Sequence, residues 1–256
     1  MRKFRPALAF FAASLAVTAA PAQKITVAAA ADLKFAMGDL TAKFEQQTGT
    51  KVNVTYGSSG NFFAQLQNGA PFDIFFSADI NYPRKLEAAG LSEPGTLYEY
   101  ALGKIVLWTP KDSPLDLESQ GWHVLLDSRA RKIAIANPAH APYGRAAVAA
   151  LKSAGIYDQV QSRLVFGENI SQTAQFVQSG SAQIGIVALS LAVSHAMRDG
   201  RRWEIPANLY PPLVQAAILL KSSKVKEEAR KFLDFVKSPD GREILEKYGF
   251  EKPAQG

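Results

Sequence analysis

The sequence contains no cysteine, which excludes disulfide bonds and thiolate chemistry. Histidine is also scarce: the three present are His123, His140 and His195, and no two of them have the i, i+4 spacing of a helical zinc site. We therefore expect neither a structural nor a catalytic metal site. We also expect no resident cofactor.

Long hydrophobic runs are missing as well, except at the N-terminus. There the basic start MRKFR is followed by an apolar stretch, 7–20, that is too short to span a bilayer comfortably. Ala-Pro-Ala at 20–22 then fits a small-x-small cleavage site. The pattern predicts a signal peptide over residues 1–22, a mature chain beginning at Gln23, and a periplasmic location.

Positive charge is less abundant than the sequence pI of about 9.4 suggests. Three of the 29 basic residues lie in the predicted signal peptide, and removing them leaves 26 against 23 acidic residues, a net charge of +3. The remaining charge runs are short or mix both signs, which is typical of solvated faces. We expect a soluble monomer with no nucleic-acid partner.

Helix and strand signals alternate along almost the whole chain. Apolar runs of strand length occur at 24–30, 51–58, 73–78, 100–110, 132–136, 164–166, 184–189 and 213–220. Helical patterns occur at 32–47, 61–68, around Leu86, and at 145–153, 171–178 and 224–236. Such alternation predicts an α/β fold of mostly parallel sheets flanked by helices. Ligands of these folds bind at the carboxyl ends of the strands.

Four corners between a predicted strand and a predicted helix share one chemical character. They are AAAADL at 28–33, YGSSGN at 56–61, NPAHAPYG at 137–144 and GENIS at 167–171. Each helix start offers unpaired N–H donors and roughly half a positive charge, which together suit an oxyanion. One such corner is more often a plain turn or a cap, such as the cap expected of Asn169. Four of them would balance a dianion without any lysine or arginine.

The same segments carry a family resemblance. KITVAAAADL, the block VNVTYGSSGNFFAQLQNGAPFDIFFSAD, NPAHAPYG, GENISQTAQFV and IGIVAL resemble the periplasmic molybdate-binding proteins of ABC transporters. The resemblance implies a two-lobed periplasmic binding protein of type II. Lobe 1 would comprise 23–103 plus 209–256, and lobe 2 would comprise 104–208. Such a protein captures molybdate or tungstate between its lobes and delivers it to an inner-membrane ABC transporter permease.

The resemblance also implies a set of ligand-binding positions. The first hydroxyl position of the family falls on Asp32, next to Ala31, and the second falls on Ser59. A small residue that donates its main-chain N–H falls on Tyr143, and a β-branched apolar residue that does the same falls on Ile170. These five residues are the predicted binding site.

The sequence departs from the family pattern at three positions. A tyrosine that commonly touches the ligand falls on Ala188, whereas a phenol is gained at Tyr143, which resembles a swap within one pocket. At Asp32 a carboxylate replaces a hydroxyl. We expect it to turn away from the anion and to cap its own helix through the N–H of Lys34 or Phe35. In the alternative arrangement it faces the ligand and accepts a proton from an anion such as hydrogen phosphate.

Other functions remain as alternatives. Sulfate, phosphate and chromate are not separated from molybdate by the sequence. A serine-dependent hydrolase would use Ser58 or Ser59, but YGSSGN does not match the G-x-S-x-G elbow, and His140 is typical of a turn. Iron(III) binding would use Tyr56 and Tyr143. We therefore expect a binding protein that is not an enzyme.

Overall fold

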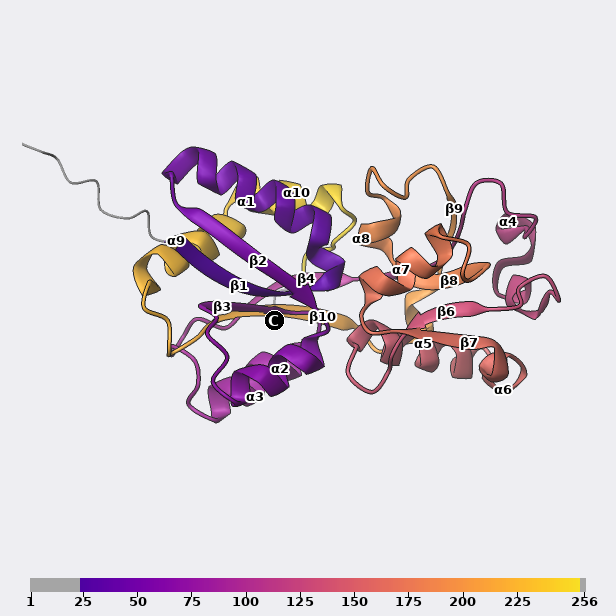
Figure 1. The fold of residues 1–256 in the computed structure, drawn as a ribbon, viewed down its shortest axis with the longest axis horizontal. Coiled ribbons are helices and arrows are strands. Elements are labelled where there is room, and N and C mark those ends of the chain that lie inside the picture. The colour runs from indigo at the N-terminus through magenta and orange to yellow at the C-terminus, as the bar shows by residue number, and fades with distance from the viewer. Residues whose placement is uncertain (1–23, 254–256) are drawn as a thin grey trace, which may run out of the picture.

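Two five-stranded sheets lie side by side along the long axis of the molecule, each flanked by helices (Figure 1). They are seen in a computed structural model that describes residues 24–253. The predicted signal peptide, 1–22, lies outside the described residues. We refer to the sheet that contains the first strand, with its helices, as lobe 1, and to the other sheet, with its helices, as lobe 2.

The sheet of lobe 1 has the strand order β2-β1-β3-β10-β4. Strands β1 and β2, and β1 and β3, pair in parallel, whereas β10 is antiparallel to both of its neighbours. The strands are β1 (Lys24–Ala30), β2 (Lys51–Gly57), β3 (Ile74–Ser77), β4 (Tyr98–Gly103) and β10 (Leu213–Leu219).

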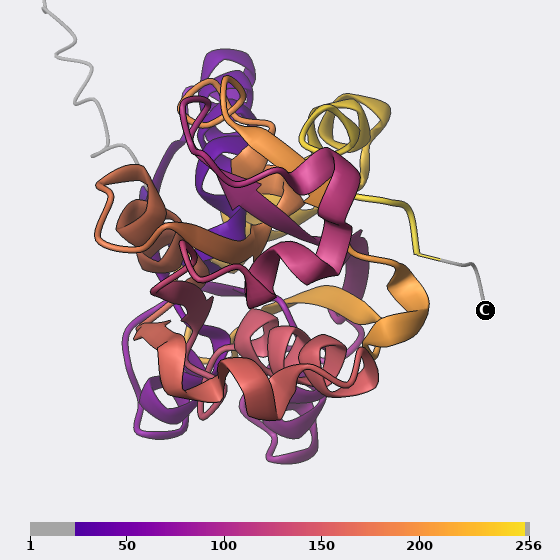
Figure 2. The ribbon, with the colours of Figure 1, turned by 90° about the vertical axis from the view of Figure 1, so that its right-hand side faces the viewer.

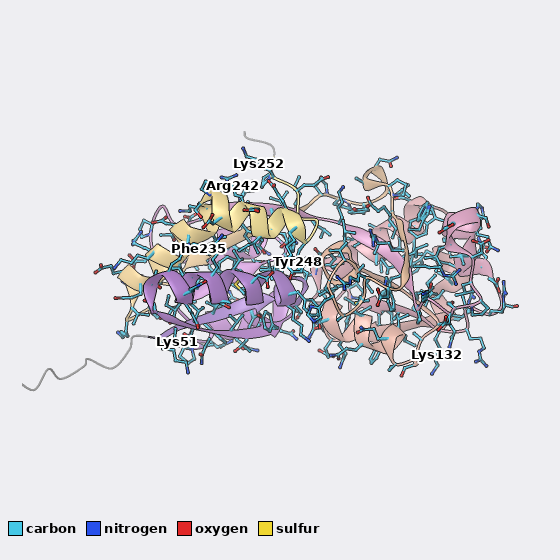
Figure 3. All side chains as sticks on the ribbon, turned by 90° about the horizontal axis from the view of Figure 1, so that it is seen from above. Lys51, Lys132, Phe235, Arg242, Tyr248 and Lys252 are labelled. Carbon is cyan, nitrogen blue, oxygen red and sulfur yellow. The ribbon has the colours of Figure 1, made fainter. Side chains whose placement is uncertain are left out.

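Helices cover both faces of this sheet. On one face lie η1 (Ala31–Leu33), α1 (Lys34–Thr48), α9 (Lys226–Lys237) and α10 (Pro239–Lys247), where Figure 3 labels Phe235, Arg242 and Tyr248. On the other lie α2 (Ser59–Gln67) and α3 (Asn81–Ala88). Within β3, Ile74 and Phe76 pack toward the first group and Phe75 toward the second. Burial on both faces explains why the strand sequences are continuous apolar runs.

The sheet of lobe 2 repeats this arrangement, with the order β7-β6-β8-β5-β9. Here β6 is parallel to β7 and β8, and β5 is antiparallel to β8 and β9. The strands are β5 (Ile105–Thr109), β6 (Ile133–Ala136), β7 (Leu164–Gly167), β8 (Ile184–Ala188) and β9 (Arg201–Glu204). The predicted α/β class, with mostly parallel sheets flanked by helices, is confirmed. In each sheet one strand, β10 or β5, is antiparallel to its neighbours.

The helices of lobe 2 are mostly short. They are α4 (Leu117–Gln120), η2 (Gly121–Leu126), α5 (Pro142–Ser153), α6 (Tyr157–Val160), η3 (Gln161–Arg163), α7 (Ile170–Gln178) and α8 (Leu189–Ala192), with η4 (Ala207–Leu209) on the return path. Figure 2, viewed from the lobe 2 end, places α5 on the same side of the molecule as α2 and α3. No helix within residues 24–253 is long and apolar enough to cross a bilayer.

One predicted strand was wrong. The run 100–110 is divided between β4 and β5, which belong to different sheets and are separated only by Lys104. Continuous β-propensity shows where a chain is extended, but hydrogen bonding to β10 on one side and to β8 on the other decides which sheet each part joins. The chain therefore leaves lobe 1 at Lys104 and returns through 205–212.

Candidate functional site

The five predicted positions line one small cavity between the lobes. Its cavity volume is about 10 Å³, the space of about one water molecule and far below the usual range for drug-sized ligands. All four predicted corners contribute to it. Its lining residues are Ala30, Ala31, Asp32, Gly57, Ser58, Ser59, Ala78, Ala141, Pro142, Tyr143, Asn169 and Ile170. Ala188 is not one of these twelve; it is fully buried in β8.

The topology explains why the corners meet. Asp32 follows β1 and Ser59 follows β2 at one sheet, while Tyr143 follows β6 and Ile170 follows β7 at the other. Parallel pairing of β1 with β2, and of β6 with β7, brings each pair of corners to one sheet edge. Each of these four residues is at most 3% exposed, so the cavity is closed to solvent at all four corners.

The start of α7 illustrates how a cap leaves one donor unused. The side-chain oxygen of Asn169 accepts hydrogen bonds from the N–H groups of Ser171 and Gln172, both at 3.0 Å, as predicted for this cap. The N–H of Thr173 donates to the carbonyl of Asn169 at 3.1 Å. Of the four N–H groups in the first turn, the one that remains is that of Ile170, at the cavity wall.

The start of α2 also leaves one donor free to face the cavity, the hydroxyl of Ser59. Ser58 caps the helix by accepting from the N–H of Asn61, and the N–H of Gly60 donates to the carbonyl of His140 in lobe 2 at 2.9 Å. The hydroxyl oxygen of Ser59 accepts from the N–H of Ala78 at 2.9 Å. That bond orients the Ser59 hydroxyl and leaves its own proton to be donated into the cavity.

The start of α5 accounts for the sequence NPAHAPYG. Pro142 occupies the first helical turn and has no N–H, so Tyr143 carries the first N–H of the helix. A Cβ added at Gly144 would collide with the carbonyl oxygen of Ala136 at the end of β6. Glycine is therefore required where the strand turns sharply into the helix.

The predicted orientation of Asp32 was wrong. No side-chain cap is formed at the start of η1 or α1; instead, the carboxylate points across the lobes. Its Oδ2 accepts from the Tyr143 hydroxyl at 2.9 Å and from the Gln215 amide at 2.7 Å. The Tyr143 phenol of lobe 2 and the Gln215 amide both lie within hydrogen-bond distance of the carboxylate. Two side-chain donors stabilise a buried carboxylate more than a single cap bond does.

The Tyr143 phenol is therefore occupied by protein groups. Besides donating to Asp32, its oxygen accepts from the Gln215 amide at 2.9 Å. Tyr100 donates to the Gln215 carbonyl at 2.6 Å and so fixes the orientation of the amide. This Asp32–Tyr143–Gln215–Tyr100 network is fully buried and joins both lobes. Gln215 and Tyr100 were not predicted from the sequence, although a single glutamine inside the apolar run LVQAAILL indicates a polar group that needs partners.

Burial raises the pKa of Asp32 to about 6, and the hydrogen bonds from Gln215 and Tyr143 oppose that rise. Burial, followed by the charge of Asp32, also raises the pKa of Tyr143 well above its usual value. Asp32 is the only carboxylic acid among the twelve lining residues, and none of the twelve is a lysine, arginine or histidine. Positive potential in the cavity therefore comes from backbone N–H groups.

Further contacts join the lobes around the cavity. Arg145 of α5 forms a salt bridge to Asp79 at 2.6 Å and donates to the Tyr82 hydroxyl at 3.2 Å. Ser190 donates to the main-chain oxygen of Asp32 at 2.8 Å. Together with the bond between Gly60 and His140, these contacts hold the lobes in a closed arrangement.

The residues do not support the iron alternative. Within residues 24–253 no group of three or more histidine, aspartate or glutamate side chains is placed to hold a metal ion. The Tyr143 phenol is committed to Asp32 and Gln215, and Tyr56 is not among the residues that line the cavity.

Known proteins of similar sequence identify the family of this chain. Residues 25–251 match the family model described as bacterial extracellular solute-binding protein. The chain belongs to this family of extracellular solute-binding proteins. It is 40% identical to the molybdate-binding protein ModA of Azotobacter vinelandii, over 93% of this chain and 94% of that protein. It is 37% identical to ModA of Rhodobacter capsulatus, over 90% and 89%.

Solved structures extend the comparison to the fold of this solute-binding protein. The periplasmic molybdate-binding protein of Azotobacter vinelandii superposes with a TM-score of 0.85 at 37% identity, covering 90% of this chain and 100% of that one. The sulfate-binding protein SubI of Mycobacterium tuberculosis matches with a TM-score of 0.71 at 15% identity, which shows a shared fold alone. The predicted type II binding-protein architecture is confirmed.

Family membership also decides how one arrangement of residues is interpreted. Ser58 Oγ lies 2.9 Å from His140 Nδ1, and His140 Nε2 lies 3.4 Å from a Glu168 carboxylate oxygen. This chain of contacts from serine to histidine to glutamate resembles a hydrolase triad. However, the relatives are binding proteins, and the Ser58 oxygen serves as a helix cap. The solute-binding protein is not an enzyme, and these residues tie α2 to lobe 2.

Proposed function

We propose that this protein captures molybdate or tungstate in the periplasm and delivers it to the permease of an ABC transporter. The anion would lie in the cavity formed by Ala31, Asp32, Ser59, Tyr143 and Ile170. The observation that carries the proposal is the convergence of four helix starts on one buried cavity whose lining contains no basic side chain. This donor set suits a small, doubly charged oxyanion.

Each position has a specific part in this proposal. Tyr143 and Ile170 would donate main-chain N–H groups from the starts of α5 and α7, and Ala31 and Asp32 would do the same from η1. Ser59 would donate its hydroxyl, which the N–H of Ala78 already orients. Several charge-assisted bonds of about 1.5–3 kcal/mol each would supply tight binding after the ordering costs are met.

The same geometry supports the proposed lobe movement. We propose 23–103 plus 209–256 and 104–208 as the two units that close on the anion. The crossing at Lys104 falls at the first of these boundaries, and the return segment, 205–212, spans the second. The relatives named as molybdate-binding, one of them periplasmic, support the choice of ligand and location.

The test of this function is calorimetric titration of dialysed protein with molybdate, tungstate, sulfate, phosphate and chromate. We expect molybdate and tungstate, which nearly match in size and charge, to bind with a Kd below about 1 μM, or roughly 8 kcal/mol. Sulfate is smaller and should bind much more weakly, because it cannot reach donors on both lobes at once. Equal affinity for sulfate and molybdate would refute the selectivity, and the absence of any binding would refute the function.

Ser59→Ala is expected to weaken molybdate binding about tenfold, which corresponds to roughly 1.4 kcal/mol and to one lost hydrogen bond to a charged group. The hydroxyl is fully buried, so no water can take its place without enlarging the cavity. Ser171→Ala serves as the control, because Ser171 also lies in the first turn of a helix in the site region but does not line the cavity. Equal effects of the two substitutions would argue against a ligand role for Ser59.

A further inference from the structure

The carboxyl group of Asp32 has one satisfied oxygen and one unsatisfied oxygen. Oδ2 accepts two hydrogen bonds, from Tyr143 and Gln215. Oδ1 is buried and has no hydrogen-bond partner among residues 24–253. Asp32 is 1% exposed and lines the cavity. A buried acceptor without a partner is costly, so this oxygen is poised for a donor that arrives with the ligand or from solvent.

No positive charge faces this carboxyl group from the elements packed around it. From α5 it faces the Tyr143 phenol, and from β10 the Gln215 amide, beyond which lies Tyr100 of β4. The groups at the starts of α2, α7 and α8 are neutral. They are Ser58, Ser59, Asn169, Ile170 and Ser190.

Two histidines lie farther out. His140 is bonded to Ser58 and paired with Glu168, and His195 packs against the Phe35 ring. Neither histidine lines the cavity. An ionised Asp32 and a bound dianion would therefore share one buried cavity without a cation between them. Two negative charges in one buried cavity raise the pKa of the weaker acid, here Asp32, and so favour its protonation.

We propose that Asp32 takes up one proton from solvent when the oxyanion binds and gives it back on release. The proton would sit on Oδ1, where the resulting O–H can donate to a ligand oxygen, while Oδ2 keeps its bonds to Tyr143 and Gln215. Asp32 thereby acts as a donor, in place of the hydroxyl that the family pattern has at this position. The inference rests on the proposed function, because it requires a dianion in this cavity.

The sign of the pH dependence follows from the same groups. Burial already brings the pKa of Asp32 to about 6, and a bound dianion raises it further. Above about pH 6 the free protein holds the carboxylate and the complex holds the acid, so binding consumes a proton and affinity rises as the pH falls. Below that range both states are protonated, and the dependence disappears.

The experiment is calorimetry of molybdate binding in two buffers of different ionisation enthalpy, such as HEPES and Tris at about pH 7.5. The slope of the observed enthalpy against the buffer enthalpy counts the protons taken up. We expect about one proton per molybdate for the wild type and about zero for Asp32→Asn, whose amide is neutral at every pH. In an acetate buffer near pH 5, the wild-type uptake should also fall toward zero.

Two further variants test whether the proton taken up on binding belongs to Asp32. Asp240→Asn removes an exposed carboxylate on α10 that pairs with Lys43, and it should leave the uptake at about one. Tyr143→Phe removes one donor to Asp32, which raises the pKa of Asp32 in the free protein, so its uptake at pH 7.5 should be smaller than that of the wild type. This variant tests the proposal even if Asp32→Asn does not fold.

The outcomes separate this inference from the proposed function. Molybdate binding by the wild type without proton uptake would overturn the inference and leave the function standing, whereas no molybdate binding would overturn the function. Uptake that persists in Asp32→Asn would assign the proton to another group and overturn the role of Asp32. Phosphate that binds more tightly than molybdate, and only when Asp32 is present, would show that the ligand supplies the proton, which also overturns the proposal.

Discussion

Replacing Gly60 with alanine is expected to weaken molybdate binding by about 100-fold or more, or roughly 2.7 kcal/mol. Gly60 lies in the first turn of α2, where its N–H donates to the carbonyl of His140 in lobe 2. A Cβ at this position would lie 2.5 Å from that carbonyl oxygen and 2.9 Å from the Tyr82 hydroxyl. The methyl group would hold the lobes apart at the cavity, so the donors of the two lobes could not reach one anion together.

Calorimetry measures the affinity, and solution scattering reports the closure. The wild type should show a smaller radius of gyration with molybdate than without it, and Gly60→Ala should show no such contraction. Gly38→Ala is the matched control, because a Cβ there meets nothing within 4 Å in the middle of α1. That control should bind normally and gain up to about 1 kcal/mol of stability from helix propensity. An affinity of Gly60→Ala within about threefold of the wild type would contradict the proposed closure.

Phe232→Ala is expected to lower the free energy of unfolding by about 3–5 kcal/mol. Phe232 is fully buried on α9, with its ring centroid 5.0 Å from that of Phe44 and 6.1 Å from that of Phe76. It joins the returning C-terminal segment to α1 and β3 of lobe 1. Removing the ring leaves a cavity at this junction, which the surrounding helices cannot fill without shifting. Chemical denaturation of the ligand-free protein measures the loss.

Phe166→Ala is the control for that substitution. Phe166 is 50% exposed on β7, so the same truncation there should change stability by no more than about 0.5 kcal/mol. Both variants should retain molybdate binding under conditions in which they are folded, because neither side chain lines the cavity. A loss of no more than about 0.5 kcal/mol for Phe232→Ala would show that α9 contributes little to the core of lobe 1.

The fold class was predictable because it depends on short-range patterns. The apolar runs at β1, β3, β6 and β8 are buried on both faces, and such strands need no long-range information to be recognised. The run 100–110 shows the limit of this approach. Propensity is a local property, whereas the change of sheet at Lys104 depends on pairing with β10, which lies more than a hundred residues further along the chain.

The parts of the site that are local to a turn could be predicted from neighbouring residues. Asn169 caps α7 and leaves the N–H of Ile170 without a partner in the helix. Pro142 and Gly144 allow the chain to turn sharply from β6 into α5. Both features depend on neighbouring residues, as caps and turns generally do. The orientation of Asp32, in contrast, depends on contacts that form only when the chain folds. Its partners, Tyr143 and Gln215, lie 111 and 183 residues away, and a carboxylate follows the strongest donors that folding brings to it rather than its own helix.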